Sequence, residues 1–131
     1  MVLIDTSVWL KFLANQSPYA AGLSELLDRD EVAAHELVYG ELLIGDSGGR
    51  SRLLTNYRRF HHVPVVAHEE VVELVRAHRL HGRGAGWIDI HLLASALVGR
   101  IKLWTADHAL FLLAQDLGIA YLPPPTHRPH H

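Results

Sequence analysis

The residues VLIDTSVW at positions 2–9 lead from an apolar run into a helical sequence through a single aspartate. The run from Val2 to Asp5 predicts a first β-strand, and Thr6 to Ala14 predicts a short helix directly behind it. Asp5 therefore stands at the carboxyl end of a strand, where open α/β sheets form their ligand crevices. An aspartate before a helix is also a common N-cap, so this residue alone does not distinguish a ligand site from a cap.

Strand-like and helix-like segments alternate along the rest of the chain, which is typical of an α/β domain with a mainly parallel sheet. The further predicted strands are 32–34, 61–66, 101–104 and 120–122. The further predicted helices are 18–28, 35–44, a short one ending near 57, 69–79, 87–98 and 108–117. Pro64 places the third strand at an edge or a crossing. Ser17 and Pro18 predict an N-cap followed by the first residue of a helix.

Length and composition favour a single globular domain. The chain has 131 residues, of which 49% are hydrophobic and 20% are charged. This is enough for one packed core but leaves no room for a second. We expect residues 1–122 to form the domain and residues 123–131, rich in proline and histidine, to form a flexible C-terminal tail.

Several classes of protein are excluded by residue content. The chain has no cysteine, so it has no disulfide, thiolate zinc site or cysteine nucleophile. It shows no basic leader and no apolar stretch that could cross a membrane, so we expect a cytoplasmic protein without membrane contact. A net charge of −2 is not that of a strongly basic nucleic-acid binder, so any polyanion site has to be local.

Four acidic residues lie in apolar settings where hydrophobic side chains are expected. They are Asp5 in VLIDTSVW, Glu41 in VYGELLIG, Asp89 in GWIDIHLLASAL and Asp107 in IKLWTADHAL. An ionised carboxylate that is buried without a partner is costly, so such groups are normally paired or neutralised. A shared divalent cation would provide the missing partner for all four.

Each acid also has a simpler structural explanation. Asp5 and Asp107 both follow a predicted strand and precede a predicted helix, so either can be an N-cap. Glu41 lies on a more apolar helical face than its competitor Glu36, and the alternatives there are a satisfied core carboxylate or a tilted helix with its edge exposed. Asp89 falls in the first turn of its helix, where a favourable interaction with the helix dipole is the alternative.

The residue types indicate the chemistry of a shared site. Inward-facing carboxylates, without cysteine and without paired histidine spacing, suit an oxygen-preferring ion such as Mg²⁺ or Mn²⁺ and suit zinc less well. Such an ion can bridge phosphate oxygens and stabilise the charge that develops during in-line displacement at phosphorus. The four acids therefore predict hydrolysis of a phosphodiester.

The motifs IDTSVW, GELLIG, WIDIHLLASAL and WTAD resemble, in order and spacing, the acidic motifs of the PIN domain and more narrowly those of VapC-type toxins of bacterial toxin–antitoxin pairs. The resemblance covers nearly the whole chain. It implies a PIN-like three-layer α/β/α domain with a central, mainly parallel sheet. It also implies that Asp5, Glu41, Asp89 and Asp107 are the catalytic, metal-binding acids, although the role of Asp107 varies across the family and can run through water.

The same resemblance implies an activity and partners. We expect an endoribonuclease that depends on Mg²⁺ or Mn²⁺, forms a homodimer and is inhibited by a small VapB-like antitoxin. Thr6, Ser7 and Thr105 become supporting polar groups. Arg83, in the glycine-rich segment HGRGAG before Asp89, is expected to contact a phosphate or the antitoxin, or to pair with a carboxylate when metal is absent.

The first two predicted helices carry more apolar side chains than one face of a small sheet needs. Ordinary core packing is one interpretation. A contact surface for a second copy of the chain or for an antitoxin helix is the other.

Two other functions remain open from the sequence. A non-catalytic PIN-like module would bind RNA or a partner without cutting it, but the presence of all four acids favours an active enzyme. A receiver-like phosphotransfer domain would phosphorylate an aspartate at a strand end. That alternative leaves Glu41 unexplained and lacks a lysine after a late strand, because Lys102 lies inside one.

Overall fold

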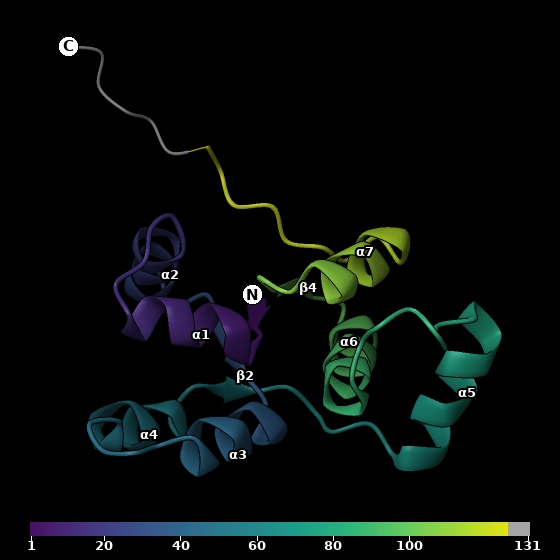
Figure 1. Cartoon of the computed structure of the whole chain (residues 1–131), viewed down its shortest axis with the longest axis horizontal. Helices are drawn as coiled ribbons and strands as arrows, with labels where there is room; N and C mark the ends of the chain where they lie inside the picture. The colour runs from purple at the N-terminus through teal and green to yellow at the C-terminus, as the bar shows by residue number, and fades with distance from the viewer. Residues whose placement is uncertain (126–131) are drawn as a thin grey trace.

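The computed structural model describes residues 1–125, in which helices cover both faces of a parallel sheet (Figure 1). The strands are β1 (Val2–Ile4), β2 (Val32–Ala34), β3 (His61–His62) and β4 (Lys102–Trp104). The helices are α1 (Thr6–Leu13), α2 (Tyr19–Asp28), α3 (Glu36–Ile44), α4 (Ser51–Tyr57), α5 (His68–His78), α6 (Trp87–Gly99) and α7 (His108–Asp116). The predicted three-layer α/β/α class is confirmed. None of these helices is long and apolar enough to cross a membrane.

The sheet has the order β3-β2-β1-β4, and every neighbouring pair is parallel. The inner strand β1 pairs Val2 with Val32 on one side and with Lys102 on the other. Parallel strands end at the same edge of a sheet. The residues that directly follow β1 and β4, which include Asp5 and Thr105, therefore meet at the carboxyl edge.

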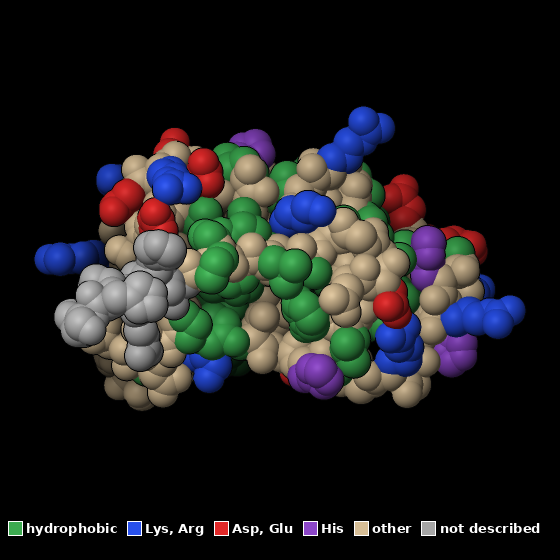
Figure 2. All heavy atoms as spheres, turned by 90° about the horizontal axis from the view of Figure 1, so that it is seen from above, with side chains coloured by type: hydrophobic (Ala, Val, Ile, Leu, Met, Phe, Trp, Pro, Cys, Tyr) green, Lys and Arg blue, Asp and Glu red, His purple; other side chains and the backbone are tan. Residues whose placement is uncertain are grey.

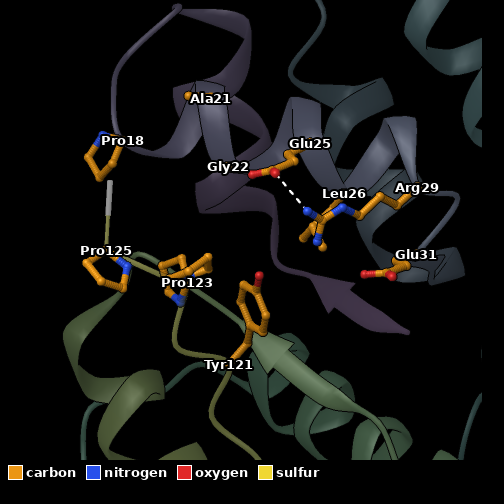
Figure 3. Close-up of a pocket in the computed structure, with 11 residues that line it drawn as sticks. Pro18, Ala21, Gly22, Glu25, Leu26, Arg29, Glu31, Tyr121, Pro123 and Pro125 are labelled. Atoms are coloured by element: carbon orange, nitrogen blue, oxygen red, sulfur yellow. Dashed lines mark hydrogen bonds and ion pairs between the residues drawn. The ribbon is translucent and has the colours of Figure 1, made fainter. Parts of the chain in front are cut away.

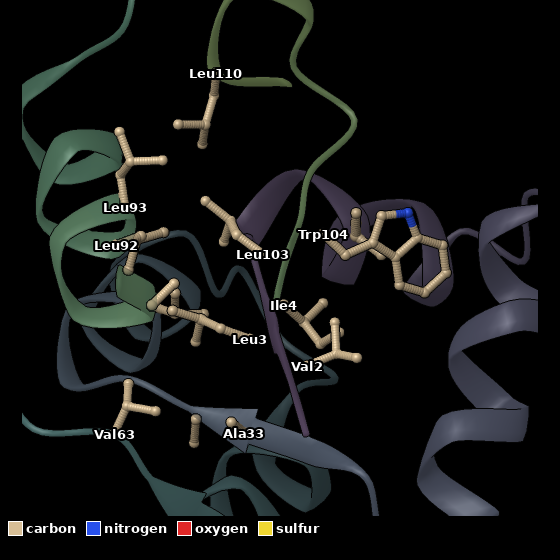
Figure 4. Packing of buried hydrophobic residues seen from close by; sticks show 14 of the residues in the cluster. Val2, Leu3, Ile4, Ala33, Val63, Leu92, Leu93, Leu103, Trp104 and Leu110 are labelled. Carbon is tan, nitrogen blue, oxygen red and sulfur yellow. The ribbon is translucent and has the colours of Figure 1, made fainter. Parts of the chain in front are cut away.

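The core lies on both faces of the sheet, as expected for the wholly apolar strands β1 and β2. Leu3 and Leu103 point toward α6, where Leu92 and Leu93 meet them (Figure 4). Val2, Ile4 and Trp104 point to the opposite face. Each of these side chains is buried, and a fully buried leucine contributes about 1.5–3 kcal/mol relative to an exposed one.

Two predicted strands are shorter in the structure. The predicted strand 61–66 forms only β3, at the sheet edge as expected, because Pro64 lacks the N–H that a ladder needs. The predicted strand 120–122 is wrong as a strand: Ala120 makes a single bridge to Leu103 before Pro123 ends the backbone pairing. Of the predicted tail 123–131, residues 126–131 lie outside the described residues.

The start of α2 also differs from the prediction. Pro18 occupies the N-cap position itself, not the first helical position, and no side chain caps the helix there. The first turn uses backbone bonds instead, from Ala20 N to Gln16 O and from Gly22 N to Pro18 O. The predicted cap at Ser17 is therefore wrong.

A buried polar pair, His35 and Ser95, joins the start of α3 to the middle of α6, and both residues are 0% exposed. His35 Nδ1 accepts a hydrogen bond from Leu37 N at 3.0 Å and so caps α3. The ring proton therefore lies on Nε2, which donates to Ser95 Oγ at 3.0 Å. The Tyr57 hydroxyl accepts from His35 N at 2.9 Å. Because α3 and α6 each carry one of the four acids, this pair fixes how those acids lie relative to one another.

His35 should make stability depend on pH. Burial, and to a smaller extent the charges of His91 and His62, lowers the pKa of His35 from 6.5 to about 4. The unfolded chain takes up this proton at higher pH than the folded chain does. The stabilising contribution is therefore complete above pH 6.5 and is lost as the pH falls through about 4.

Urea unfolding of the wild type and His35→Gln from pH 7 to 4 measures this contribution. The free energy of unfolding of the wild type should fall by about 3 kcal/mol more than that of the variant over this range. The variant should also be less stable at pH 7, because it loses the bond to Ser95. Equal pH slopes would show that the imidazole is not held neutral.

Candidate functional site

Asp5 occupies the N-cap position of α1, but its side chain does not cap the helix. It is 4% exposed, and its Oδ2 accepts two hydrogen bonds of 2.7 Å, from Ser7 Oγ and from Thr105 Oγ1. Ser7 Oγ in turn accepts from Ala106 N at 2.9 Å. The Asp5 carboxylate therefore holds the end of β1 against the end of β4, and the capping explanation for Asp5 does not apply.

Glu41 lies half-buried on α3 and reaches the start of α1. Its Oε1 accepts a 2.7 Å hydrogen bond from Thr6 Oγ1. Glu36, the competing acid on the same helix, is exposed and sits in the first turn. The preference for Glu41 as the inward-facing acid agrees with this placement.

Asp89 lies in the first turn of α6, where its Oδ2 accepts from Gly86 N at 3.2 Å. Burial is the main cause that raises the pKa of Asp89 from 3.8 to about 6, and the charges of Asp5, Asp107 and Glu41 raise it further. The four carboxylates, which come from four separate segments, therefore lie within one electrostatic environment.

Asp107 is the exposed member of the group and serves as the N-cap of α7. Its Oδ1 accepts from Leu110 N at 2.9 Å, and its own N–H donates to Thr105 Oγ1 at 3.0 Å. The capping explanation for Asp107 is therefore correct. It does not exclude a second role, because the cap uses only one of the two carboxylate oxygens.

The four acids share one pattern. Each engages a single carboxylate oxygen with the protein, and within residues 1–125 the second oxygen accepts no hydrogen bond. The salt bridges of this part of the chain join Arg29 to Glu25 and Arg83 to Asp116, so no described lysine or arginine neutralises the group. These acids are held in place while four oxygens stay open.

The donor set fits a hard divalent cation in chemistry. It offers only oxygen ligands, and a cation would relieve the repulsion that raises the pKa of Asp89. Along the described chain, however, no three acidic or histidine side chains lie close enough together to hold a metal ion as they stand. As they stand, the four acids therefore do not form a closed metal cage.

Arg83 does not lie against Asp89. Its guanidinium pairs with Asp116 of α7 at 2.8 Å, and the two side chains are 38% and 56% exposed. Asp116 is therefore a surface residue. A surface ion pair of this kind contributes at most about 1 kcal/mol, so substrate or a partner can displace it.

Sequence reasoning missed two features near the acids. One is the His35–Ser95 pair, whose members carry no motif that would have identified them. The other is an aromatic hollow beside Asp107 and Thr105, lined in part by Tyr19 and Phe111. A larger hollow of about 600 Å³ lies between α2 and residues 121–125, where Tyr121 faces the Glu25–Arg29 ion pair (Figure 3). That larger hollow includes none of the four acids.

The raised pKa of Asp89 predicts that neutralising this residue stabilises the metal-free protein. Ionised Asp89 opposes folding, so stability is lost as the pH rises from about 4 through about 6. In EDTA above pH 6, Asp89→Asn should therefore melt at a higher temperature than the wild type, and the gap should narrow as the pH falls toward 4. A lower melting temperature for the variant at pH 7.5 would show that burial and the neighbouring carboxylates do not make ionised Asp89 unfavourable.

Comparison with known proteins bears on the fold and the family. The model of the PIN domain family matches residues 2–115. Ribonuclease VapC32 from two strains of Mycobacterium tuberculosis is 43% identical to the chain over 121 residues, which cover 92% of this chain and 95% of the relative.

A solved structure has the same fold. The crystal structure of PAE2754 from Pyrobaculum aerophilum superposes with a TM-score of 0.55 at 19% identity, covering 89% of this chain and 94% of that one. This likeness agrees with the family match over most of the chain and with the 43% identical relative. The chain belongs to the PIN domain family.

Proposed function

We propose that this protein is a metal-dependent endoribonuclease of the VapC type. The observation that carries the proposal is the set of four carboxylates, each with one oxygen fixed and one open, and with no described cation to neutralise them. The 43% identical relative is named a ribonuclease, which supports RNA as the substrate. An oxygen-only site also favours Mg²⁺ or Mn²⁺ over zinc.

Asp5, Glu41 and Asp89 would hold the ion, with Asp107 at the exposed side. When bound, the ion supplies Lewis acidity toward the phosphodiester and lowers the pKa of a coordinated water. Asp5 is positioned by Ser7 and Thr105, and its burial excludes bulk water from that side. Thr6 aims Glu41 at the same region.

Asp107 has a separate role in this proposal. Its Oδ1 is committed to the α7 cap, so its exposed Oδ2 is the oxygen available to accept a proton from the attacking water. Attack by water, in place of the ribose 2′-hydroxyl, leaves a 5′-phosphate and a 3′-hydroxyl. No protein nucleophile is needed.

The expected partners follow from the same proposal. A VapB-like antitoxin would keep the enzyme silent in the cytoplasm, and Arg83 could leave Asp116 to contact the antitoxin or an RNA phosphate. A homodimer is supported by large apolar side chains left exposed at helix ends. These include Leu43 (51%), Ile44 (89%) and Val98 (62%).

Single substitutions test the acids against a matched control. Asp5→Asn and Glu41→Gln should each lower the rate of RNA cleavage in Mg²⁺ by more than about 100-fold, because they remove an ion-holding charge and change little volume. Glu36→Gln, on the same helix as Glu41 but exposed, should keep wild-type activity. Gel analysis of a labelled RNA with purified protein, with and without EDTA, provides the measurement.

The opposite results separate the alternatives. Full activity in Asp5→Asn would mean that the acids are not the reaction centre. RNA binding by the wild type with no chelator-sensitive cleavage would support a non-catalytic PIN-like module instead. Circular dichroism of each variant confirms that a loss of activity is not a loss of fold.

A further inference from the structure

A hollow of about 270 Å³ opens beside Asp107, one of the four acids. Its aromatic lining comes from Tyr19 of α2, Trp104 of β4, Phe111 of α7 and Tyr121 of the C-terminal segment, and Thr105 and Asp107 form part of the same wall. On the face that carries α2, α7 and the C-terminal segment, hydrophobic side chains gather at the surface (Figure 2). We call this site the aromatic hollow.

The rings of the aromatic hollow are held in place without a ligand. Trp104 is 3% exposed and stacks on Tyr19 with ring centres 5.9 Å apart and an angle of 28°. It also meets Tyr121 edge-on at 5.3 Å. Gly22 makes room for this arrangement, because a Cβ there would lie 2.9 Å from Trp104 Cη2. Tyr19 and Phe111 are only half-buried, so part of each ring faces the hollow.

The aromatic hollow and the acidic site are covalently tied together. Trp104, Thr105 and Asp107 belong to one short segment at the end of β4. Trp104 lines the hollow, and Thr105 donates a hydrogen bond to Asp5. Asp107 lines the hollow and is also one of the four acids. A nucleotide whose phosphate lies at the acids can therefore place a neighbouring base in the hollow.

The charges beside the hollow suit the uncharged base of a nucleotide better than an anionic group. The Asp107 carboxylate in the wall repels anions, whereas the flat face of a base is uncharged and stacks on aromatic rings. Lys11 Nζ lies 5.6 Å from the centre of the Tyr19 ring, so a positive charge is available to a phosphate that adjoins a base in the hollow. Single-stranded RNA combines these two features.

We propose that the aromatic hollow binds one unstacked base of the RNA substrate next to the cleaved phosphodiester and so helps to set which sequence is cut. This inference rests on the proposed nuclease function and adds a specificity-determining subsite to it. Phe111 and the exposed part of the Tyr19 ring contact the base, and Trp104, which stacks on Tyr19, acts as a positioning residue.

Binding and cleavage of a random RNA pool test the subsite. The purified full chain is titrated into labelled single-stranded RNA of random sequence in EDTA, and fluorescence anisotropy reports the affinity. The unlabelled pool is then cut in Mg²⁺, and the new ends are sequenced to give the base preference at each position around the cut.

Four variants complete the design. Phe111→Leu and Tyr19→Leu should each weaken binding by about 5- to 100-fold and flatten the base preference at the same single position. Phe111→Trp keeps an aromatic face and should retain both properties. Leu112→Ala is the matched control, because Leu112 is on the same helix, is 38% exposed and does not line the hollow; it should behave as the wild type.

The outcomes separate this inference from the proposed function. If the folded Phe111→Leu and Tyr19→Leu variants bind and cut RNA as the wild type does, the subsite is overturned and the nuclease stands, even if antitoxin binding is lost. If the wild type binds RNA through Phe111 but cuts nothing, the subsite stands and the nuclease fails. A wild type that neither binds nor cuts the pool overturns both.

Discussion

One carboxylate oxygen of Asp5 holds the start of this fold to the end of its last strand. Asp5 Oδ2 accepts from Ser7 in the first helix and from Thr105, a hundred residues later, at the end of the last strand. Parallel pairing of β1 with β4 brings these groups together. Because Asp5 is nearly fully buried, these bonds replace the hydrogen bonds to water that this oxygen loses on burial. The other three acids lie around this fixed point.

Much of the fold could be predicted from the sequence, because each strand and helix carries its own local pattern. The acids at strand ends could be located for the same reason, since an apolar run that stops at Asp5 or Asp107 marks the carboxyl edge of a sheet. Local sequence patterns do not predict the structure where pairing between distant segments determines it. Residues 120–122 look like a strand but make one bridge, because too few residues remain before the prolines.

The missed parts of the site depend on contacts between distant residues. His35 and Ser95 are sixty residues apart and bond only once α3 and α6 are packed. Arg83 stands near Asp89 in sequence, yet the fold directs it to Asp116. The four rings of the aromatic hollow come from four separate segments, so no single sequence motif predicts it. The residues that hold the acids were easier to identify, because Thr6, Ser7 and Thr105 lie inside the acidic motifs.

Anomalous scattering from crystals grown with Mn²⁺ would show whether the four acids form one cation site. We expect a manganese peak at the carboxyl edge of the sheet, which Asp5, Glu41 and Asp89 would contact directly or through water. Crystals that show no peak there at millimolar Mn²⁺, or a peak that Asp5 and Asp89 do not contact, would contradict the account.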